Sequence, residues 1–487
     1  SGKMAEGAPY LIGAVVMVFV VFVSTIIKSK KITFLNDASV AIVIGLIVGS
    51  ILRAVGRDLD FDDRLFFNFL LPPIVFYAGF SLQRKNFFRN LSSILVFSYM
   101  GTLLTTVLVG LACFGLVKTG LVDISIFECF LFGAVISATG NPCQLLAVFN
   151  DLSAPQTLWN LMFGEAMLTD AVAVVVFSTL VGMAEQTSAD FTVATGFQAL
   201  GVFIAVSVGS ALVGFVVALV GAAILRTKLL SVPRLELPFL LLIAYIAYQI
   251  AQIAYLSGSM SIFVCGIISA HYSLHNLTPE STVSSFRFFE TLAYLCEVFV
   301  FTFLGVSVME RTAHWDVAFI LLSMLFFIAA RAFVVPVLAA FVNIRRKNQI
   351  GWKFQFVMWF AGLRRGAVAV ALAFALPDDH DHPNLAHVRL VHAATLTIVI
   401  VTNLLMGSLT GPVLWVLKLK IDDEPIPPPT PGPPVQISGE KMWQERTGLH
   451  KRWKEFDERY MKKVFGGSIH PKQGLTTGGE ERVDNRL

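Results

Sequence analysis

The chain has 487 residues, of which 55% are hydrophobic and 14% charged, and its mean hydropathy is +0.72. Soluble proteins carry about 25% charged residues, so this composition excludes an ordinary soluble protein and indicates a polytopic, all-α membrane protein. The net charge of +4 is too small to indicate a nucleic-acid partner. The five cysteines lack metal-ligand spacing, and the histidines form no catalytic pattern, so we expect no disulfide framework, no cofactor and no enzyme.

A spanning helix needs about 20 mostly apolar residues, and by that rule the chain contains about thirteen spans. Their expected ranges are 9–28, 38–55, 65–82, 91–117, 126–149, 157–183, 192–225, 236–255, 258–273, 286–308, 316–342, 354–377 and 387–418. Lysine and arginine gather in the loops after the first, third, seventh and eleventh spans. The positive-inside rule places these loops in the cytosol, with the N-terminus outside or lumenal and the C-terminus cytosolic.

Two of the expected spans contain an interruption near the middle. Residues 137–142 of the fifth read Ser-Ala-Thr-Gly-Asn-Pro, and residues 362–366 of the twelfth read Gly-Leu-Arg-Arg-Gly. Broken helices are tolerated in a membrane where the freed backbone groups line a cavity or contact protein. Interruptions at corresponding positions of two six-span halves point to a transporter binding site. A bent structural helix would explain each interruption alone, but not their symmetry.

The sixth span carries two acids, Glu165 and Asp170. Ionisable groups inside a membrane cost several kcal/mol unless they are paired or face a wet cavity, so they indicate function. The helical repeat separates the two side chains by about 140°. We therefore expect Asp170 to face the broken fifth span and Glu165 to face another helix. Glu165 is expected to pair with a buried arginine. The alternative is that both acids are structural ion-pair partners.

The candidate partners of Glu165 are arginines of the eleventh and twelfth spans. Arg331 lies in the eleventh span, and Arg364 and Arg365 lie in the interruption of the twelfth. Glu297, on the tenth span, is a further buried acid that is free to pair with any of the three. Buried arginine is nearly always matched to a carboxylate, so all four residues are expected to form structural ion pairs near the site.

A site for a hard monovalent cation follows from the remaining polar groups. Asp170 supplies the charge, and the Thr169 hydroxyl, the Asn141 side chain and backbone carbonyls near Thr139 supply neutral oxygens. A carboxylate that holds either a proton or a cation makes the two compete, and competition leads to exchange. The exchange is electroneutral if Asp170 alone carries the swapped charge.

The composition changes after the last span. We expect a transmembrane domain over residues 1–420, a Pro-rich linker over 421–437, a cytosolic amphipathic helix over 438–465 and a disordered tail over 466–487. Trp453, Phe456, Tyr460 and Val464 recur in the helix at helical spacing. Such a helix is expected to lie on the membrane surface, to bind a regulatory partner, or to pack on the protein's own cytosolic face.

Several motifs, in the same order along roughly residues 10–465, resemble the sodium/proton exchanger family of the cation/proton antiporter-1 group. The resemblance is strongest to the endosomal/organellar branch of that family. The motifs are Leu71-Pro72-Pro73-Ile74, Ala78-Gly79-Phe80-Ser81-Leu82, Phe87-Phe88-Arg89-Asn90, the Phe-Gly-Glu run that starts at Phe163, Ile350-Gly351-Trp352, Met358-Trp359-Phe360-Ala361-Gly362-Leu363-Arg364 and Trp453-Lys454-Glu455-Phe456.

The resemblance implies an NhaA-like antiporter fold, with inverted six-helix repeats and two crossed broken helices. It also implies exchange of Na⁺ or K⁺ for H⁺ by an elevator motion, in a homodimer surrounded by membrane lipids. The resemblance further implies the membrane of an endosome or Golgi-type organelle, with the plasma membrane as the alternative. The family's essential acid corresponds to Asp170, its preceding acid to Glu165 and its buried arginine to Arg331.

The chain departs from the family pattern at three places. Thr169 replaces an asparagine, Gly140-Asn141 replaces one aspartate, and Arg364-Arg365 replaces one arginine. The site thereby loses an acid and gains a base, which predicts weaker cation binding or a lower pKa of Asp170. A divergent exchanger with altered or lost transport, acting as a sensor or scaffold through its tail, is the second hypothesis. A channel fits less well, because the sequence contains no repeated filter motif.

Overall fold

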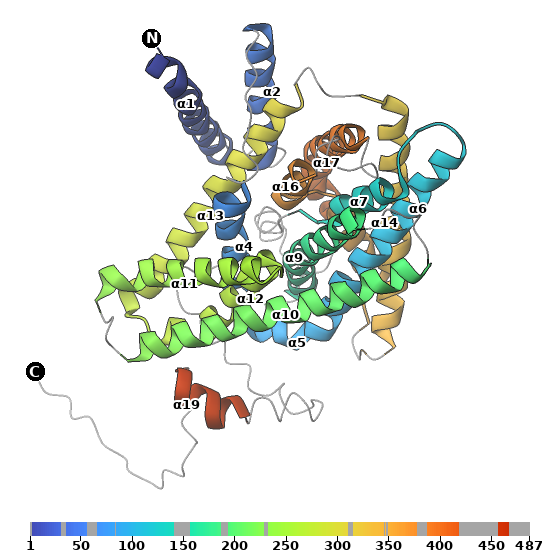
Figure 1. Cartoon of the computed structure of the whole chain (residues 1–487). Helices are drawn as coiled ribbons and strands as arrows, with labels where there is room; N and C mark the ends of the chain where they lie inside the picture. The colour runs from blue at the N-terminus through green and yellow to red at the C-terminus, as the bar shows by residue number, and fades with distance from the viewer. Residues whose placement is uncertain are drawn as a thin grey trace, which may run out of the picture.

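The computed structural model describes residues 2–30, 36–55, 66–82, 84–140, 156–186, 193–227, 232–309, 315–344, 346, 349–376, 387–417 and 456–466. Throughout these ranges the regular structure is helical and includes no β-strand (Figure 1). The predicted all-α class is therefore confirmed. Of the predicted tail, residues 418–455 and 467–487 lie outside the described part, as does Asn141.

The described helices follow one another along the chain. They are α1 Gly2–Ser29, α2 Asp37–Val55, η1 Phe66–Leu70, α4 Leu71–Phe80, α5 Arg84–Leu95, η2 Val96–Met100, α6 Gly101–Lys118, α7 Ile126–Ser137, α9 Gln156–Gln186, α10 Val193–Arg226, α11 Pro233–Ile253, α12 Gly258–His271, η3 Ser273–His275, α13 Pro279–Ser307, α14 Val317–Asn343, α15 Trp352–Ala361, α16 Ala367–Phe374, α17 Val388–Leu417, η6 Asp457–Met461 and α19 Lys462–Phe465.

The described helices agree with the expected spans. Eight are long and apolar enough to cross a membrane, and three shorter apolar helices accompany them at Gly13–Ile27, Phe66–Phe80 and Ile126–Ser137. Together with α12 and the interrupted pair of α15 and α16, they place a helical segment in each of the thirteen predicted ranges. The chain is thus a multi-pass membrane protein.

Polar side chains at the start of several helices fix where these helices begin. Ser125 and Glu128 form a capping box at α7, in which each side chain accepts a hydrogen bond from the other residue's backbone N–H. Glu128 also accepts a hydrogen bond from the backbone N–H of His387, at the start of α17. The side chains of Ser257 and Asp316 cap α12 and α14 by accepting hydrogen bonds from backbone N–H groups in the first turn of each helix. Each cap satisfies N–H groups that the helix leaves without a partner.

The helices form two groups. In the first, α13 packs along α2, α12 packs along α4, and α10, α11 and α12 pack on one another. In the second, α6 packs along α7 and α14, α9 contacts α5 and α7, and α17 contacts α15 and α16. Figure 1 shows α10, α11, α12 and α4 close together, with α7, α16 and α17 on the other side of α9. The groups meet where α9 and α16 contact α4, α12 and α13.

Glycine allows the closest contacts inside the first group. A Cβ atom on Gly45 of α2 would collide with the backbone carbonyl of Thr302 on α13, and one on Gly305 would collide with the backbone of Ile42. Small residues at a helix crossing let two backbones approach, which is a common packing mode inside membranes.

Candidate ion-binding site

The second predicted interruption is present, and residues 138–140, the described non-helical start of the first, meet it. The helix α7 ends at Ser137, where the chain turns to an extended conformation at Ala138, and α15 and α16 are separated by residues 362–366. The backbone N–H of Gly140, in the first interruption, donates a hydrogen bond of 2.8 Å to the carbonyl of Arg364 in the second. The segment that follows α7 therefore touches the interruption between α15 and α16.

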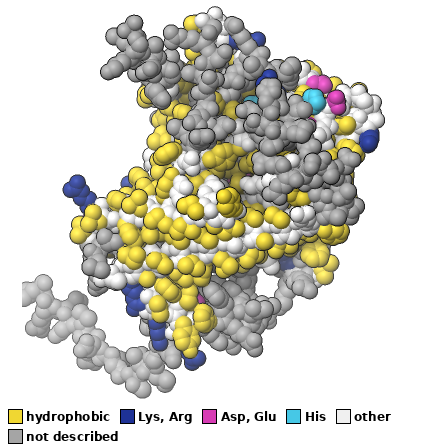
Figure 2. Space-filling view, in the orientation of Figure 1, with side chains coloured by type: hydrophobic (Ala, Val, Ile, Leu, Met, Phe, Trp, Pro, Cys, Tyr) yellow, Lys and Arg dark blue, Asp and Glu magenta, His cyan; other side chains and the backbone are white. Residues whose placement is uncertain are grey.

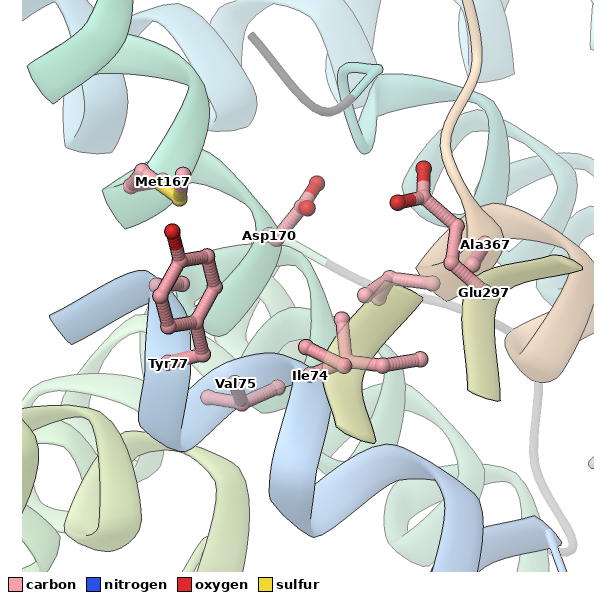
Figure 3. A pocket seen from close by; sticks show the side chains of 10 residues that line it. Ile74, Val75, Tyr77, Met167, Asp170, Glu297 and Ala367 are labelled. Atoms are coloured by element: carbon pink, nitrogen blue, oxygen red, sulfur yellow. The ribbon is translucent and has the colours of Figure 1, made fainter. Parts of the chain in front are cut away.

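Asp170 of α9 faces a cavity beside these interruptions, at the junction of the two helix groups (Figure 3). Residues of α4, α9, α13 and α16 line the cavity. They are Ile74, Val75, Tyr77, Ala78, Met167, Asp170, Ala293, Glu297, Ala367 and Val368. The Asp170 carboxylate lies next to the first interruption, where it accepts a hydrogen bond from the backbone N–H of Thr139. Its Oδ1 atom is buried and has no hydrogen-bond partner among the described residues.

Glu297 lines the same cavity from α13. Figure 3 shows its carboxylate and that of Asp170 pointing toward the same space from two different helices. Glu297 is also close enough to Asp170 and to Arg364 to interact with both electrostatically. The site therefore holds two carboxylates, one on each helix group, and an arginine beside the second.

Glu165 turns away from this cavity, toward α14. Its Oε1 atom accepts a hydrogen bond of 3.1 Å from Nη2 of Arg331, and both side chains are buried. Of the three candidate arginines, Arg331 is thus the one that pairs with Glu165. The rotation of about 140° between Glu165 and Asp170 along the helix explains why the two acids have different neighbours.

Arg365 occupies the carbonyl groups of both interruptions. Its fully buried guanidinium donates to the carbonyls of Ile136 and Ala138 at the end of α7, the latter at 2.5 Å, and to those of Gly362 and Leu363 at the end of α15. Carbonyls at the C-terminal end of a helix carry partial negative charge, so a cation is favourable there. One arginine therefore caps two half-helices.

Further contacts hold Arg365 in place. The Arg365 guanidinium lies over the ring of Phe327, 4.3 Å from the ring centre. The backbone carbonyl of Arg365 accepts a hydrogen bond of 2.8 Å from the Asn403 side chain of α17. The stacked and forked geometry is specific to arginine. Asn403 is a residue that the sequence reasoning missed, although a lone amide in an apolar span is a signal that could have found it.

The neutral ligands expected around Asp170 stay a prediction, and the structure describes the contacts of two of them, Thr139 and Thr169. The hydroxyl of Thr139 donates to the carbonyl of Ala166 at 3.4 Å. Thr169 is buried, has no hydrogen-bond partner for its hydroxyl among the described residues and does not line the cavity. Carbonyls near Thr139 instead accept from Arg365. Asn141, the remaining expected ligand, falls outside the described residues.

The fold and this site define a class of protein. Broken helices that meet beside buried carboxylates, at the junction of two helix groups, are the arrangement of a secondary transporter. The profile of the family described as "Sodium/hydrogen exchanger, transmembrane" matches residues 17–416. The chain belongs to the sodium/hydrogen exchanger family.

Named relatives agree with this assignment. The horse sodium/hydrogen exchanger 9 is 33% identical over 440 residues, which cover 87% of this chain and 67% of the relative. The human sodium/hydrogen exchanger 7 is 32% identical over 460 residues, covering 86% of this chain and 62% of the relative. The mouse sodium/hydrogen exchanger 8 is 30% identical over 429 residues, covering 86% and 73%. The chain thus spans about two thirds of the length of these relatives.

A solved structure shares the fold. The sodium proton antiporter MjNhaP1 from Methanocaldococcus jannaschii superposes with a TM-score of 0.64, over 85% of this chain and 99% of the antiporter chain. The sequence identity is 19%, so the likeness concerns the fold alone.

Proposed function

We propose that this chain exchanges Na⁺ or K⁺ for H⁺ across an organelle membrane, with Asp170 carrying either the proton or the cation. The observation that carries the proposal is the position of Asp170. Its carboxylate faces a cavity at the junction of the two helix groups, while Glu165 is already paired with Arg331. Asp170 is therefore available for a mobile charge, and Glu165 is not.

The buried charges support an electroneutral exchange. The site contains acids and arginines in equal number among the described residues, and they are Glu165, Asp170, Glu297, Arg331, Arg364 and Arg365. With Asp170 ionised the set is neutral, and a bound proton or a bound monovalent cation adds the same single charge. The same balance weakens cation binding, because arginines already compensate the charge of Asp170.

The ligands of the cation come from the walls of the cavity. Asp170 and Glu297 offer carboxylate oxygens from opposite helix groups to the same small cavity. Glu297 is thus a second proposed ligand beside Asp170. Because the two carboxylates stand on different helix groups, sliding one group past the other separates them and opens the site to the opposite side, which is an elevator motion.

The relatives and motifs support the remaining features. Similarity to sodium/hydrogen exchangers 9, 7 and 8, and motifs like those of the organellar branch, favour an endosome or Golgi-type membrane over the plasma membrane. A homodimer and a cytosolic C-terminus follow from the same resemblance and from the positive-inside rule.

Flux measurements in liposomes test the proposal. The protein is reconstituted, the lumen is acidified, and lumenal pH is followed after addition of Na⁺, K⁺ or Li⁺. The intact chain should alkalinise the lumen on addition of at least one cation. Asp170→Asn should abolish the response, whereas Asp123→Asn, in an exposed loop, should keep it. A full response in Asp170→Asn would contradict the assignment.

One observation favours a second candidate, a divergent family member that has lost transport and acts as a scaffold. Arg365 already fills the carbonyl-rich region of the two interruptions with a permanent positive charge. The same liposomes decide between the two functions. A folded intact chain, shown by a cooperative thermal transition, that moves no protons with any of the three cations would favour the scaffold.

A further inference from the structure

The tail is described over residues 456–466, and its helical part, η6 and α19, docks on the first helix group. Asp457 accepts a hydrogen bond of 2.5 Å from the hydroxyl of Tyr272, and its other oxygen lies 3.3 Å from Nε2 of His271. Asn276 donates to the carbonyl of Phe465 at 2.8 Å, and Arg226 donates to the carbonyl of Lys463. The tail is thus held by polar contacts along its whole described length.

The docked side of this helix is not the side that the sequence pattern marked as apolar. Met461 and Phe465 pack on a small apolar cluster formed by Leu219, Ala222 and Tyr272. Asp457, Met461 and Phe465 are spaced by four residues and so share one side of the helix. The predicted apolar stripe is offset from that side by one residue, so it faces a different direction.

That stripe is exposed. Phe456 is 46% exposed, and Tyr460 and Val464 are each 56% exposed. Arg459 and Lys463 are exposed beside them. We call these five residues the tail stripe. Figure 2 shows hydrophobic side chains next to Lys and Arg side chains at the place where Figure 1 draws α19.

The tail stripe lies at the level where spanning helices end. Arg226 is the last residue of α10 and His271 the last residue of α12, and both contact the tail. Outward-facing apolar residues of α10, such as Val216, Val220 and Ile224, lead up to this level. An aromatic and basic surface at the end of spanning helices is where an interfacial helix meets headgroups.

We propose that the tail stripe binds the anionic lipid surface of the protein's own membrane. The rings of Phe456 and Tyr460 and the side chain of Val464 enter the boundary between headgroups and acyl chains, and Arg459 and Lys463 contact the phosphates. The stripe is too small for a stable protein interface, which needs roughly 20 residues a side. A few rings and two cations suffice for a lipid surface, because the membrane already holds the chain nearby.

Quenching by labelled lipids tests the proposal on the full chain. A fluorophore is attached to Val464→Cys, and the unaltered chain, whose described cysteines are all buried, provides the labelling blank. The protein is reconstituted in vesicles of phosphatidylcholine alone or with added phosphatidylserine, with or without lipids that carry a nitroxide quencher. We expect quenching by the nitroxide lipids, and about twofold more of it when phosphatidylserine is present.

Charge variants show whether the basic residues matter. Arg459→Gln with Lys463→Gln should remove the effect of phosphatidylserine, whereas Lys118→Gln with Arg287→Gln, which neutralises two exposed cations elsewhere, should leave it. Hydrogen exchange of residues 456–466 shows that the helix stays docked in each variant. A label that nitroxide lipids do not quench in either vesicle would overturn the proposal. The proposal would also be overturned if the label at Val464→Cys were shielded from solvent in detergent, to a degree that grows with protein concentration. That result would show that the tail stripe contacts a second copy of the chain.

Discussion

Arg331 and Glu165 form a buried ion pair that joins α14 to α9. Removing one partner leaves the other charge uncompensated in a place without water, which costs about 3–5 kcal/mol. Arg331→Ala should therefore lower the free energy of unfolding by that amount, measured by denaturation in detergent. Arg287→Ala, at an exposed position, should change it by less than about 0.5 kcal/mol. Equal small losses in the two variants would show that Arg331 does not stabilise the fold.

The neighbouring arginines of the second interruption have separate tasks. Arg365 holds backbone carbonyls, while the Arg364 side chain interacts with Glu297 on the cavity wall. Arg364→Gln removes a positive charge close to the cation site, and it should lower the half-saturating Na⁺ concentration in the liposome assay by about threefold to tenfold. Arg287→Gln is the matched control. An unchanged half-saturating concentration in Arg364→Gln would mean that its charge does not reach the site.

Asp457 makes the docking of the tail depend on pH. Burial favours the neutral acid, but hydrogen bonds from His271 and Tyr272 and the charges of His271 and Lys462 outweigh it and hold the pKa of Asp457 below its usual value. The ionised carboxylate therefore stabilises docking above the ordinary aspartate pKa of about 3.9, and this contribution is lost as pH falls through the lower pKa of the docked state.

Asp457→Asn should release the tail at neutral pH. The loss of a buried charged acceptor costs about 1.5–3 kcal/mol, so hydrogen exchange of residues 456–466 should become about tenfold faster or more. In the unaltered chain, protonation of Asp457 should weaken tail docking only below about pH 4. Asp123→Asn should leave the exchange unchanged. Protection that survives Asp457→Asn would show that the apolar contacts of Met461 and Phe465 hold the tail alone.

At the scale of elements, the crossing of α2 and α13 depends on glycine. A Cβ at residue 45 would meet the backbone of Thr302, which has no side-chain freedom to yield. Gly45→Ala should destabilise the fold by about 1–3 kcal/mol, measured as a lower thermal transition. Gly13→Ala is the control, because a Cβ at residue 13 would have nothing within 4 Å. A transition unchanged by Gly45→Ala would mean that the two helices have room to move apart.

The elements themselves were largely predictable from the sequence. Apolar runs long enough to cross a membrane identified the spans, and proline, glycine and paired arginines identified both interruptions, because these signals are local. The roles of Arg364 and Arg365 were not predictable, since neighbouring residues point in different directions and their partners lie on α7, α13 and α17. For the same reason the sequence identified Asp170 but not the cavity-facing position of Glu297, which depends on how two helix groups meet.

The tail shows a different limit of the sequence pattern. The spacing of Phe456, Tyr460 and Val464 correctly marked one apolar side of a helix, yet the structure buries the adjacent side instead. Periodicity reports which side chains share a face. It does not report which face packs on protein and which face contacts lipid, because that depends on the shape and charge of the surface to which the helix docks.

Across the whole molecule, the two helix groups hold a carboxylate site between them. Asp170 and Glu297 approach the same cavity from different groups, and the interrupted helices place two half-helix ends and Arg365 beside it. A site at such a junction changes its accessible side when the groups move. Its buried charges are balanced, so the binding of one proton or of one monovalent cation gives the site the same net charge.

In the proposed exchange, proton and cation compete for Asp170. The competition is measured by the protons that the detergent-solubilised protein releases when Na⁺ or K⁺ is added in weakly buffered solution. We expect release of up to one proton per chain, saturating with the cation, with none from Asp170→Asn and normal release from Asp123→Asn. Cation binding without proton release, or equal release from Asp170→Asn, would contradict the proposed competition.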